Sequence, residues 1–165
     1  SMGGMTGQWL AINHPERFHH LMLCNTAAKI GNEAAWVDRA QLVREQGLKP
    51  IAATAASRWF TASFIDNYPD VVKALSDALV AGSSEGYASC CEALSDADTR
   101  EQLKDIRVPV TVVAGTEDPV TTVADGQYMV DHIPNATLTT INASHISNIE
   151  QPDVFNQLIK QYFHD

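Results

Sequence analysis

The sequence predicts an α/β fold in which parallel strands with flanking helices are interrupted by an inserted helical cap. Three observations support this prediction. Helical and strand patterns alternate at both ends of the chain. Between them, residues 32–100 contain alanine-rich helical segments and no convincing strand. The 165 residues are 45% hydrophobic and 19% charged, which is typical of a globular chain with one real core.

The first two predicted elements are a short helix and a strand. Residues 3–18 carry apolar side chains at roughly helical spacing, and the helix is expected to end near His14 because Pro15 follows it. Residues 20–26 form a compact apolar run between polar residues, which is typical of a strand buried on both faces. A helix followed by such a strand favours a parallel sheet.

The central and C-terminal elements follow in order. Four helices are predicted in the cap, at residues 33–46, 50–60, 70–81 and 85–95. Strands and helices are then predicted to alternate again: a strand at residues 110–114, a helix at 123–132, a strand at 136–141 and a final helix at 152–163. The expected domains are residues 1–31 and 101–165 for the core, with the cap at 32–100.

Three parallel strands make an incomplete sheet, since parallel strands need neighbours and helices on both faces. We therefore expect N-terminal strands that belong before Ser1 to be missing from this sequence. An unpaired edge would then lie beside the strand around Met22, and such edges recruit partner strands. The expected partner at this edge is a companion N-terminal segment or, through self-association, a second copy of the chain.

The composition excludes two classes of partner. The formal net charge is −9 at pH 7, whereas nucleic acid and anionic membrane surfaces are bound through basic patches. We expect no nucleic-acid partner and no membrane partner, and no apolar stretch approaches the length of a membrane span. An anionic substrate would need an arginine or lysine that receives it locally, against the overall field of the protein.

The cysteines indicate a reducing compartment. Cys24, Cys90 and Cys91 are odd in number and two of them are adjacent, so they fit neither a disulfide framework nor a zinc site. The N-terminal residues also lack the charged region and apolar core of a secretion signal. The sequence therefore predicts a cytoplasmic protein with reduced thiols.

Ser1 is the candidate nucleophile. It leads through Met2, Gly3 and Gly4 directly into a predicted helix, as the nucleophile elbow G-x-S-x-G does, although the strand and first glycine of that motif are absent. In such an elbow the next amide faces the developing oxyanion, which makes the N–H of Met2 the candidate donor. A serine before a methionine at position 1 is also what a cleaved purification tag leaves, and position alone favours that alternative.

Asp118 and His145 are the candidate acid and base. Asp118 follows an apolar strand, where functional loops emerge from a parallel sheet, although an aspartate before a proline is also an ordinary turn. Glu117 is a weaker competitor. His145 lies in the loop between the last predicted strand and the last helix, where a lone histidine is usually a surface residue. The order Ser, Asp, His is nevertheless the order of the triad that usually accompanies a nucleophile elbow.

The other histidines are not predicted to form a metal site. They show no metal-ligand spacing on one face of an element, and we expect them to be solvated. They are His14, His19, His20, His132 and His164.

With these motifs, the chain resembles the bacterial 3-oxoadipate enol-lactonases, a family of α/β-hydrolases, along its whole length. The C-terminal part of the resemblance is carried by residues 143–148 (ASHISN) and 150–152 (EQP). The cap part is carried by residues 57–61 (SRWFT), 86–94 (GYASCCEAL) and 96–98 (DAD). The resemblance implies the C-terminal part of an α/β-hydrolase fold that starts at the nucleophile elbow.

The resemblance also implies an activity. These enzymes hydrolyse a five-membered enol-lactone with a carboxylate side chain to 3-oxoadipate, in the β-ketoadipate pathway of aromatic degradation, with no metal and no organic cofactor. Arg58 is the candidate for binding the carboxylate, with Trp59 as an aromatic wall. A surface role is equally expected for Arg58, and packing within the cap is slightly favoured for Trp59.

Two alternative hypotheses remain open. A carboxylesterase or a cofactor-free perhydrolase would use the same triad on a different substrate. The chain could also be a non-catalytic fragment that oligomerises through its open sheet edge, a hypothesis motivated by the absent N-terminal strands and by the missing loop that supplies the second oxyanion amide.

Overall fold

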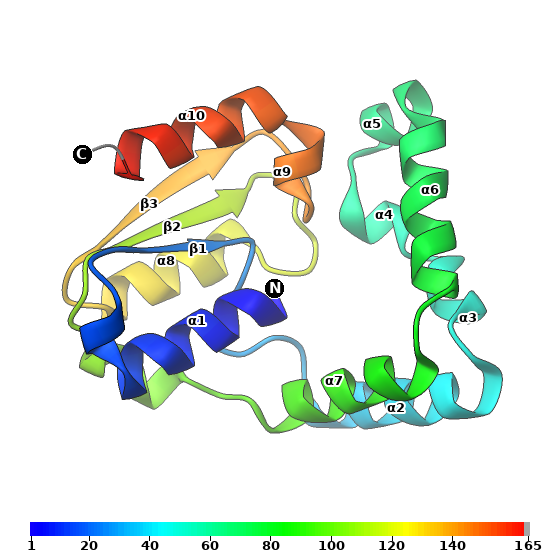
Figure 1. Ribbon diagram of the computed structural model, residues 1–165, viewed down its shortest axis with the longest axis horizontal. Helices are drawn as coiled ribbons and strands as arrows, with labels where there is room; N and C mark the ends of the chain where they lie inside the picture. The colour runs from blue at the N-terminus through cyan, green and yellow to red at the C-terminus, as the bar shows by residue number, and fades with distance from the viewer. Residues whose placement is uncertain (164–165) are drawn as a thin grey trace. The chain divides into compact units, whose positions relative to one another are not determined.

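The computed structural model describes residues 1–163 and divides into two compact units (Figure 1). The core unit comprises Ser1–Ile30 and the chain from Asp98 onward, and the helical unit comprises Gly31–Ala97. Within the described residues, no helix is both long and apolar enough to cross a membrane.

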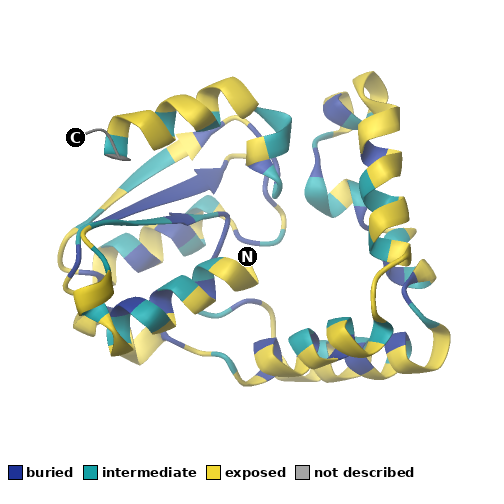
Figure 2. Cartoon of the chain, viewed as in Figure 1, coloured by how far each residue is buried: buried dark blue, intermediate teal, exposed yellow. Residues whose placement is uncertain are grey.

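The core unit is built on a parallel sheet, which confirms the predicted α/β class. Its strand order is β1-β2-β3, with β1 at Leu21–Cys24, β2 at Val110–Gly115 and β3 at Ala136–Ile141. The register pairs Leu21 with Val110 and Val110 with Ala136. Every residue of β2 is buried, as Figure 2 shows, because β2 has a neighbouring strand on each side.

Helices cover both faces of this sheet. Helices α1 (Met2–Asn13) and α8 (Val123–His132) share one face with the 3₁₀ helix η2 (Arg100–Asp105), where Leu23, Val112 and Met129 belong to one buried cluster. Helix α10 (Pro152–Phe163) packs through Phe155 and Leu158 on the opposite face, beside Val113. Alternation of side chains along the strands produces the two clusters. The 3₁₀ helix η1 (Pro15–Arg17) links α1 to β1, and helix α9 (Ser147–Glu150) precedes α10.

The prediction for the first strand was partly wrong. Residues 20–26 were expected to form a strand buried on both faces, but β1 spans only Leu21–Cys24, and Leu23 is its one buried residue. Within the described residues β1 pairs with β2 alone, so it is an edge strand and is less covered than β2. The strand ends at Asn25, whose φ of 46° leaves the extended region.

The helical unit contains helices and no strand among its residues 31–97. Its elements are α2 (Glu33–Gln46), α3 (Lys49–Ala52), α4 (Ala56–Trp59), α5 (Ala62–Asn67), α6 (Pro69–Val80) and α7 (Ser84–Asp96). Helices α2 and α7 pack together through a small buried cluster of Ala40, Ala88 and Cys91.

One local prediction in this unit was wrong, and one helix was missed. Residues 50–60 were expected to form one helix, but α3 and α4 are separate. Between them the amides of Thr54 and Ala55 bond to carbonyls three residues back, Ile51 (3.3 Å) and Ala52 (3.2 Å), so the α-helical ladder is interrupted. Helix α5 was not predicted, and it begins where the Thr61 hydroxyl accepts a hydrogen bond from the amide of Phe64.

Candidate active site

Three loops of the core unit emerge at the same edge of the sheet. They follow the carboxyl ends of β1, β2 and β3 and carry Asn25, Asp118 and His145, respectively. In a parallel sheet these ends lie side by side, so residues far apart in sequence meet there. Of the three strands, β2 is buried along its whole length, whereas β1 and β3 are only partly buried.

Asp118 and His145 are in direct contact. The distance between His145 Nδ1 and Asp118 Oδ2 is 2.8 Å, and the Asp118 side chain is fully buried while that of His145 is 11% exposed. A carboxylate only accepts hydrogen bonds, so the contact assigns the proton to Nδ1 of the imidazole. Nε2 is then left as the acceptor, which is the state required of a general base.

The surroundings of Asp118 keep it ionised. Burial alone would raise the pKa of this carboxyl, but hydrogen bonding and charge from His145, the Asn25 amide and the backbone amide of Thr121 outweigh burial and lower the pKa to about 2. Asp118 Oδ1 accepts from the amides of Val120 (2.8 Å) and Thr121 (3.1 Å). Its negative charge is therefore fixed beside His145 at neutral pH. Glu117 is exposed, which favours Asp118 over this competitor.

Ser1 lies near the carboxyl end of β1. Its carbonyl accepts a hydrogen bond from the Thr26 hydroxyl (2.7 Å). A Cβ on Gly4 would lie 2.5 Å from Thr26 Cβ, so glycine lets α1 approach the chain this closely. Burial lowers the pKa of the Ser1 amino group while Asp118 and Cys24 act in the opposite direction, which places Ser1 within electrostatic reach of Asp118. A contact between the Ser1 hydroxyl and His145 stays a prediction.

The N-terminus of α1 presents amide groups beside Ser1. The Ser1 carbonyl accepts from the amides of Gly4 (2.9 Å) and Met5 (3.2 Å). Among the described residues, the Ser1 side chain forms no capping hydrogen bond, and the first turn of α1 carries no acidic residue. The amide of Met2 precedes the bonded ones, at the positive end of the helix. Its role as an oxyanion donor stays a prediction.

Arg58 and Trp59 lie on α4 in the helical unit, and both are half-buried. The Arg58 guanidinium donates a hydrogen bond to the Thr54 hydroxyl (2.9 Å). Burial lowers the pKa of Arg58, the nearby Arg39 lowers it further, and Tyr87 acts in the opposite direction. The positive charge of Arg39 therefore lies close enough to Arg58 to influence its guanidinium group. Contact of Arg58 or Trp59 with a ligand stays a prediction.

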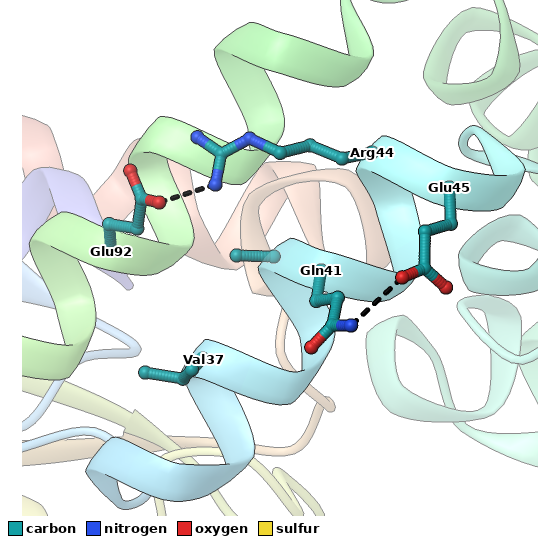
Figure 3. A pocket seen from close by; sticks show the side chains of 6 residues that line it. Val37, Gln41, Arg44, Glu45 and Glu92 are labelled. Carbon is teal, nitrogen blue, oxygen red and sulfur yellow. Dashed lines mark hydrogen bonds and ion pairs between the residues drawn. The ribbon is translucent and has the colours of Figure 1, made fainter.

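A hollow lies along α2 in the helical unit (Figure 3). Its polar side chains are paired with one another, since Gln41 donates to Glu45 (2.8 Å) and Arg44 forms an ion pair with Glu92. Arg44 also binds Glu85 (2.7 Å). These pairs account for the polar groups of the hollow without a ligand.

Three residues of the site were not predicted. Asn25 and Thr121 both donate to Asp118 Oδ2, at 3.1 and 2.8 Å, and Glu150 accepts from the amide of Ser144 (2.8 Å). The available signal was position: Asn25 follows an apolar strand directly, and Thr121 stands three residues after the candidate acid. Neither position indicates which group a side chain will contact.

The prediction that the remaining histidines are solvated was wrong for His20. Its Nε2 lies 2.9 Å from the hydroxyl of the buried Thr111, and its ring stacks on Tyr162. His164 lies outside the described residues. Within the described part of the chain, no group of three or more His, Cys, Asp or Glu side chains is arranged to hold a metal ion.

The sequence profile of the alpha/beta hydrolase fold family matches residues 1–152. The chain is 62% identical over 160 residues to 3-oxoadipate enol-lactonase 2 of Acinetobacter baylyi, covering 97% of this chain and 60% of that protein. It is 40% identical to 3-oxoadipate enol-lactonase 1 of the same organism, covering 98% of this chain and 61% of the relative. The chain thus spans about three fifths of the length of these relatives.

Two solved structures are similar to this chain in fold. The enol-lactonase from Burkholderia xenovorans LB400 superposes with a TM-score of 0.96 at 41% identity, covering 100% of this chain and 64% of that one. A thermophilic esterase from Thermogutta terrifontis superposes with a TM-score of 0.91 at 25% identity, covering 98% of this chain and 61% of that one.

Proposed function

The chain belongs to the α/β-hydrolase fold family, and from this premise we propose that it forms the catalytic part of an enzyme that hydrolyses an enol-lactone. The observation that carries the proposal is the buried Asp118–His145 pair at the sheet edge where Ser1 begins α1. The similarity to the two Acinetobacter enol-lactonases supports the choice of a lactone as substrate.

The proposed reaction follows from these residues. His145 Nε2 removes the proton of the Ser1 hydroxyl, whose oxygen attacks the lactone carbonyl, while the Met2 amide and the positive end of α1 stabilise the oxyanion. Collapse of the tetrahedral intermediate breaks the ring C–O bond, and the departing enolate takes the proton from His145. Asp118 stabilises the imidazolium and holds its tautomer. Water activated by His145 then hydrolyses the acyl-enzyme, and tautomerisation of the released enol gives 3-oxoadipate.

A carboxylesterase using the same residues is the second candidate, favoured by the structural similarity to the Thermogutta esterase. A substrate panel separates the two. We expect kcat/KM of the full-length protein for the enol-lactone to exceed that for aryl acetates by roughly 100-fold or more, since substrate choice reflects differential transition-state binding. Loss of the lactone is followed by ultraviolet absorbance and ester hydrolysis by release of the phenol. A preference for the aryl acetates would contradict the lactonase proposal and favour the esterase.

Arg58 is the proposed binding site for the substrate carboxylate. The protein carries a net charge of −9, so an anionic substrate must be received by a local cation. The second guanidinium, Arg39, adds positive charge near Arg58, and the half-buried setting reduces screening by solvent.

The Arg58→Gln variant is expected to raise KM for the anionic lactone by roughly 10- to 100-fold with little change in kcat, because a charge-assisted hydrogen bond used in binding is lost. The methyl ester of the same lactone is the control substrate, and its KM should be nearly the same in both proteins. Arg44→Gln is the matched variant, since Arg44 lies in the same unit and pairs with Glu85 and Glu92. An equal loss on the neutral ester would contradict a role for Arg58 in carboxylate binding.

Two further features of the proposal concern the setting of the protein. The edge of β1 is proposed to pair with another strand, from a companion N-terminal segment or from a second copy, because β1 pairs with β2 alone within the described residues. A cytoplasmic location is proposed on the basis of the free thiols of Cys24, Cys90 and Cys91.

A further inference from the structure

We propose that Asn25 is a positioning residue that holds the acid and base loops of the site in register, an inference that rests on the proposed Ser-Asp-His function. Its side-chain amide nitrogen donates to Asp118 Oδ2 (3.1 Å) and to the carbonyl of Ser144 (3.1 Å). Its side-chain oxygen accepts from the hydroxyl of Ser147 (2.5 Å). One side chain therefore contacts the acid itself and residues on both sides of the base.

These three hydrogen bonds involve both the amide nitrogen and the amide oxygen of the Asn25 side chain. Both amide hydrogens and the amide oxygen are engaged, and the residue is only 5% exposed, so water offers little substitute. An aspartate at this position would turn an acceptor toward the Asp118 carboxylate and the Ser144 carbonyl, where donors are needed. The shape of the residue and its donors are therefore both required.

The backbone at Asn25 directs this side chain. Its φ of 46° lies in the left-handed region, which asparagine adopts at lower cost than most residues. Glycine at position 115 provides the space, because a Cβ there would lie 3.1 Å from Asn25 Nδ2 and 2.5 Å from the carbonyl oxygen of Ala143. The end of β1, the end of β2 and the base loop thus meet around one amide group.

The division of contacts on Asp118 identifies what Asn25 adds. Asp118 Oδ1 is held by amides of its own loop, those of Val120 and Thr121. Oδ2 contacts His145 and accepts a hydrogen bond from the Thr121 hydroxyl of the acid loop, and it also accepts one from Asn25, which follows another strand, β1. Loss of the Asn25 amide should therefore leave the acid loop folded but let the base loop shift relative to it. A shift on the order of 1 Å at a catalytic pair can cost roughly 100-fold in rate.

The test uses Asn25→Gly, which keeps the left-handed backbone accessible and removes only the side chain. In the full-length protein we expect kcat for the enol-lactone to fall by roughly 10- to 100-fold with KM changed by less than about 2-fold. We also expect the low-field proton resonance of His145 Nδ1–H to broaden or move upfield. Asn142→Gly is the matched control, since Asn142 is exposed at the same edge, and it should change neither quantity.

Asn25→Asp tests the same inference if the glycine variant fails to fold, because it preserves the shape of the side chain. Its kcat should fall further than that of Asn25→Gly, because a second carboxylate would face Asp118 Oδ2 and the Ser144 carbonyl with acceptors where the amide donates. An unchanged His145 resonance and kcat in either folded variant would overturn the inference. A wild-type protein that shows the resonance but does not hydrolyse the lactone would instead overturn the proposed function, and the resonance would still test Asn25.

Discussion

Replacement of His145 by alanine is expected to lower kcat for the enol-lactone by about 10⁵-fold or more in the full-length protein. In the proposed mechanism the imidazole carries the proton from Ser1 to the departing enolate, and loss of the base of such a triad removes nearly all of its contribution. The Nδ1 contact with the buried Asp118, at 2.8 Å, is what prepares Nε2 for this role. Steady-state kinetics on the lactone measures the effect.

The same variant also tests Ser1. A fluorophosphonate probe reacts only with an activated serine, so it should label Ser1 in the wild-type protein and not in His145→Ala. His132→Ala is the matched control, because His132 is an exposed histidine that stacks on Tyr128 in α8, and labelling should persist there. Turnover that survives the His145 substitution would overturn the assignment of the base. Labelling elsewhere than Ser1 would overturn the assignment of the nucleophile alone.

The elements predicted most accurately are those with strong local signals. Strand β3 and helices α2, α8 and α10 begin and end where the sequence predicted. Helix α8 has a capping box between Thr122 and Asp125, and α10 has proline in its first position, both of which mark a helix start in the sequence. The acid and base candidates were predicted from loop position, the acid after the strand at residues 110–114 and the base between the last strand and the last helix, and their catalytic roles stay predictions.

Two of the three missed features depend on contacts distant in sequence. Asn25 lies 93 residues from Asp118 and 122 from Ser147 in the sequence. Its proposed positioning role depends on a left-handed φ, which the neighbouring residues do not indicate. His20 was misjudged because its partner, Thr111, belongs to the neighbouring strand. The break between α3 and α4 falls in an alanine-rich run whose propensity is helical throughout. For Asn25 and His20, contacts distant in sequence rather than local preference decided the outcome. The break between α3 and α4 instead accompanies the local hydrogen bonds of the Thr54 and Ala55 amides to carbonyls three residues back.

Replacement of Asp118 by asparagine is expected to lower kcat by about 10⁴-fold, the size of the effect in a well-studied serine protease triad. An amide at this position can donate to His145 Nδ1 and thereby favour the tautomer that carries its proton on Nε2, which cannot act as the base. Thr121 and Asn25 both donate to Oδ2, so an NH₂ group there would also face two donors. Steady-state kinetics measures the loss, and Glu117→Gln, at the exposed neighbouring position, should retain activity.

The same substitution should remove a pH dependence of stability. The folded protein holds the pKa of Asp118 at about 2, below the ordinary 3.8, so its ionised form stabilises the fold at pH values above the ordinary pKa and this contribution is lost as the pH falls through the folded pKa. The shift corresponds to about 2 kcal/mol in total, of which about half is lost between pH 5 and pH 3. Urea unfolding at these two pH values should therefore show wild type losing about 1 kcal/mol more than Asp118→Asn. Equal losses in the two proteins would mean that the buried carboxylate gains nothing from His145 and Asn25, and the site would then lack the fixed charge on which the proposed base depends.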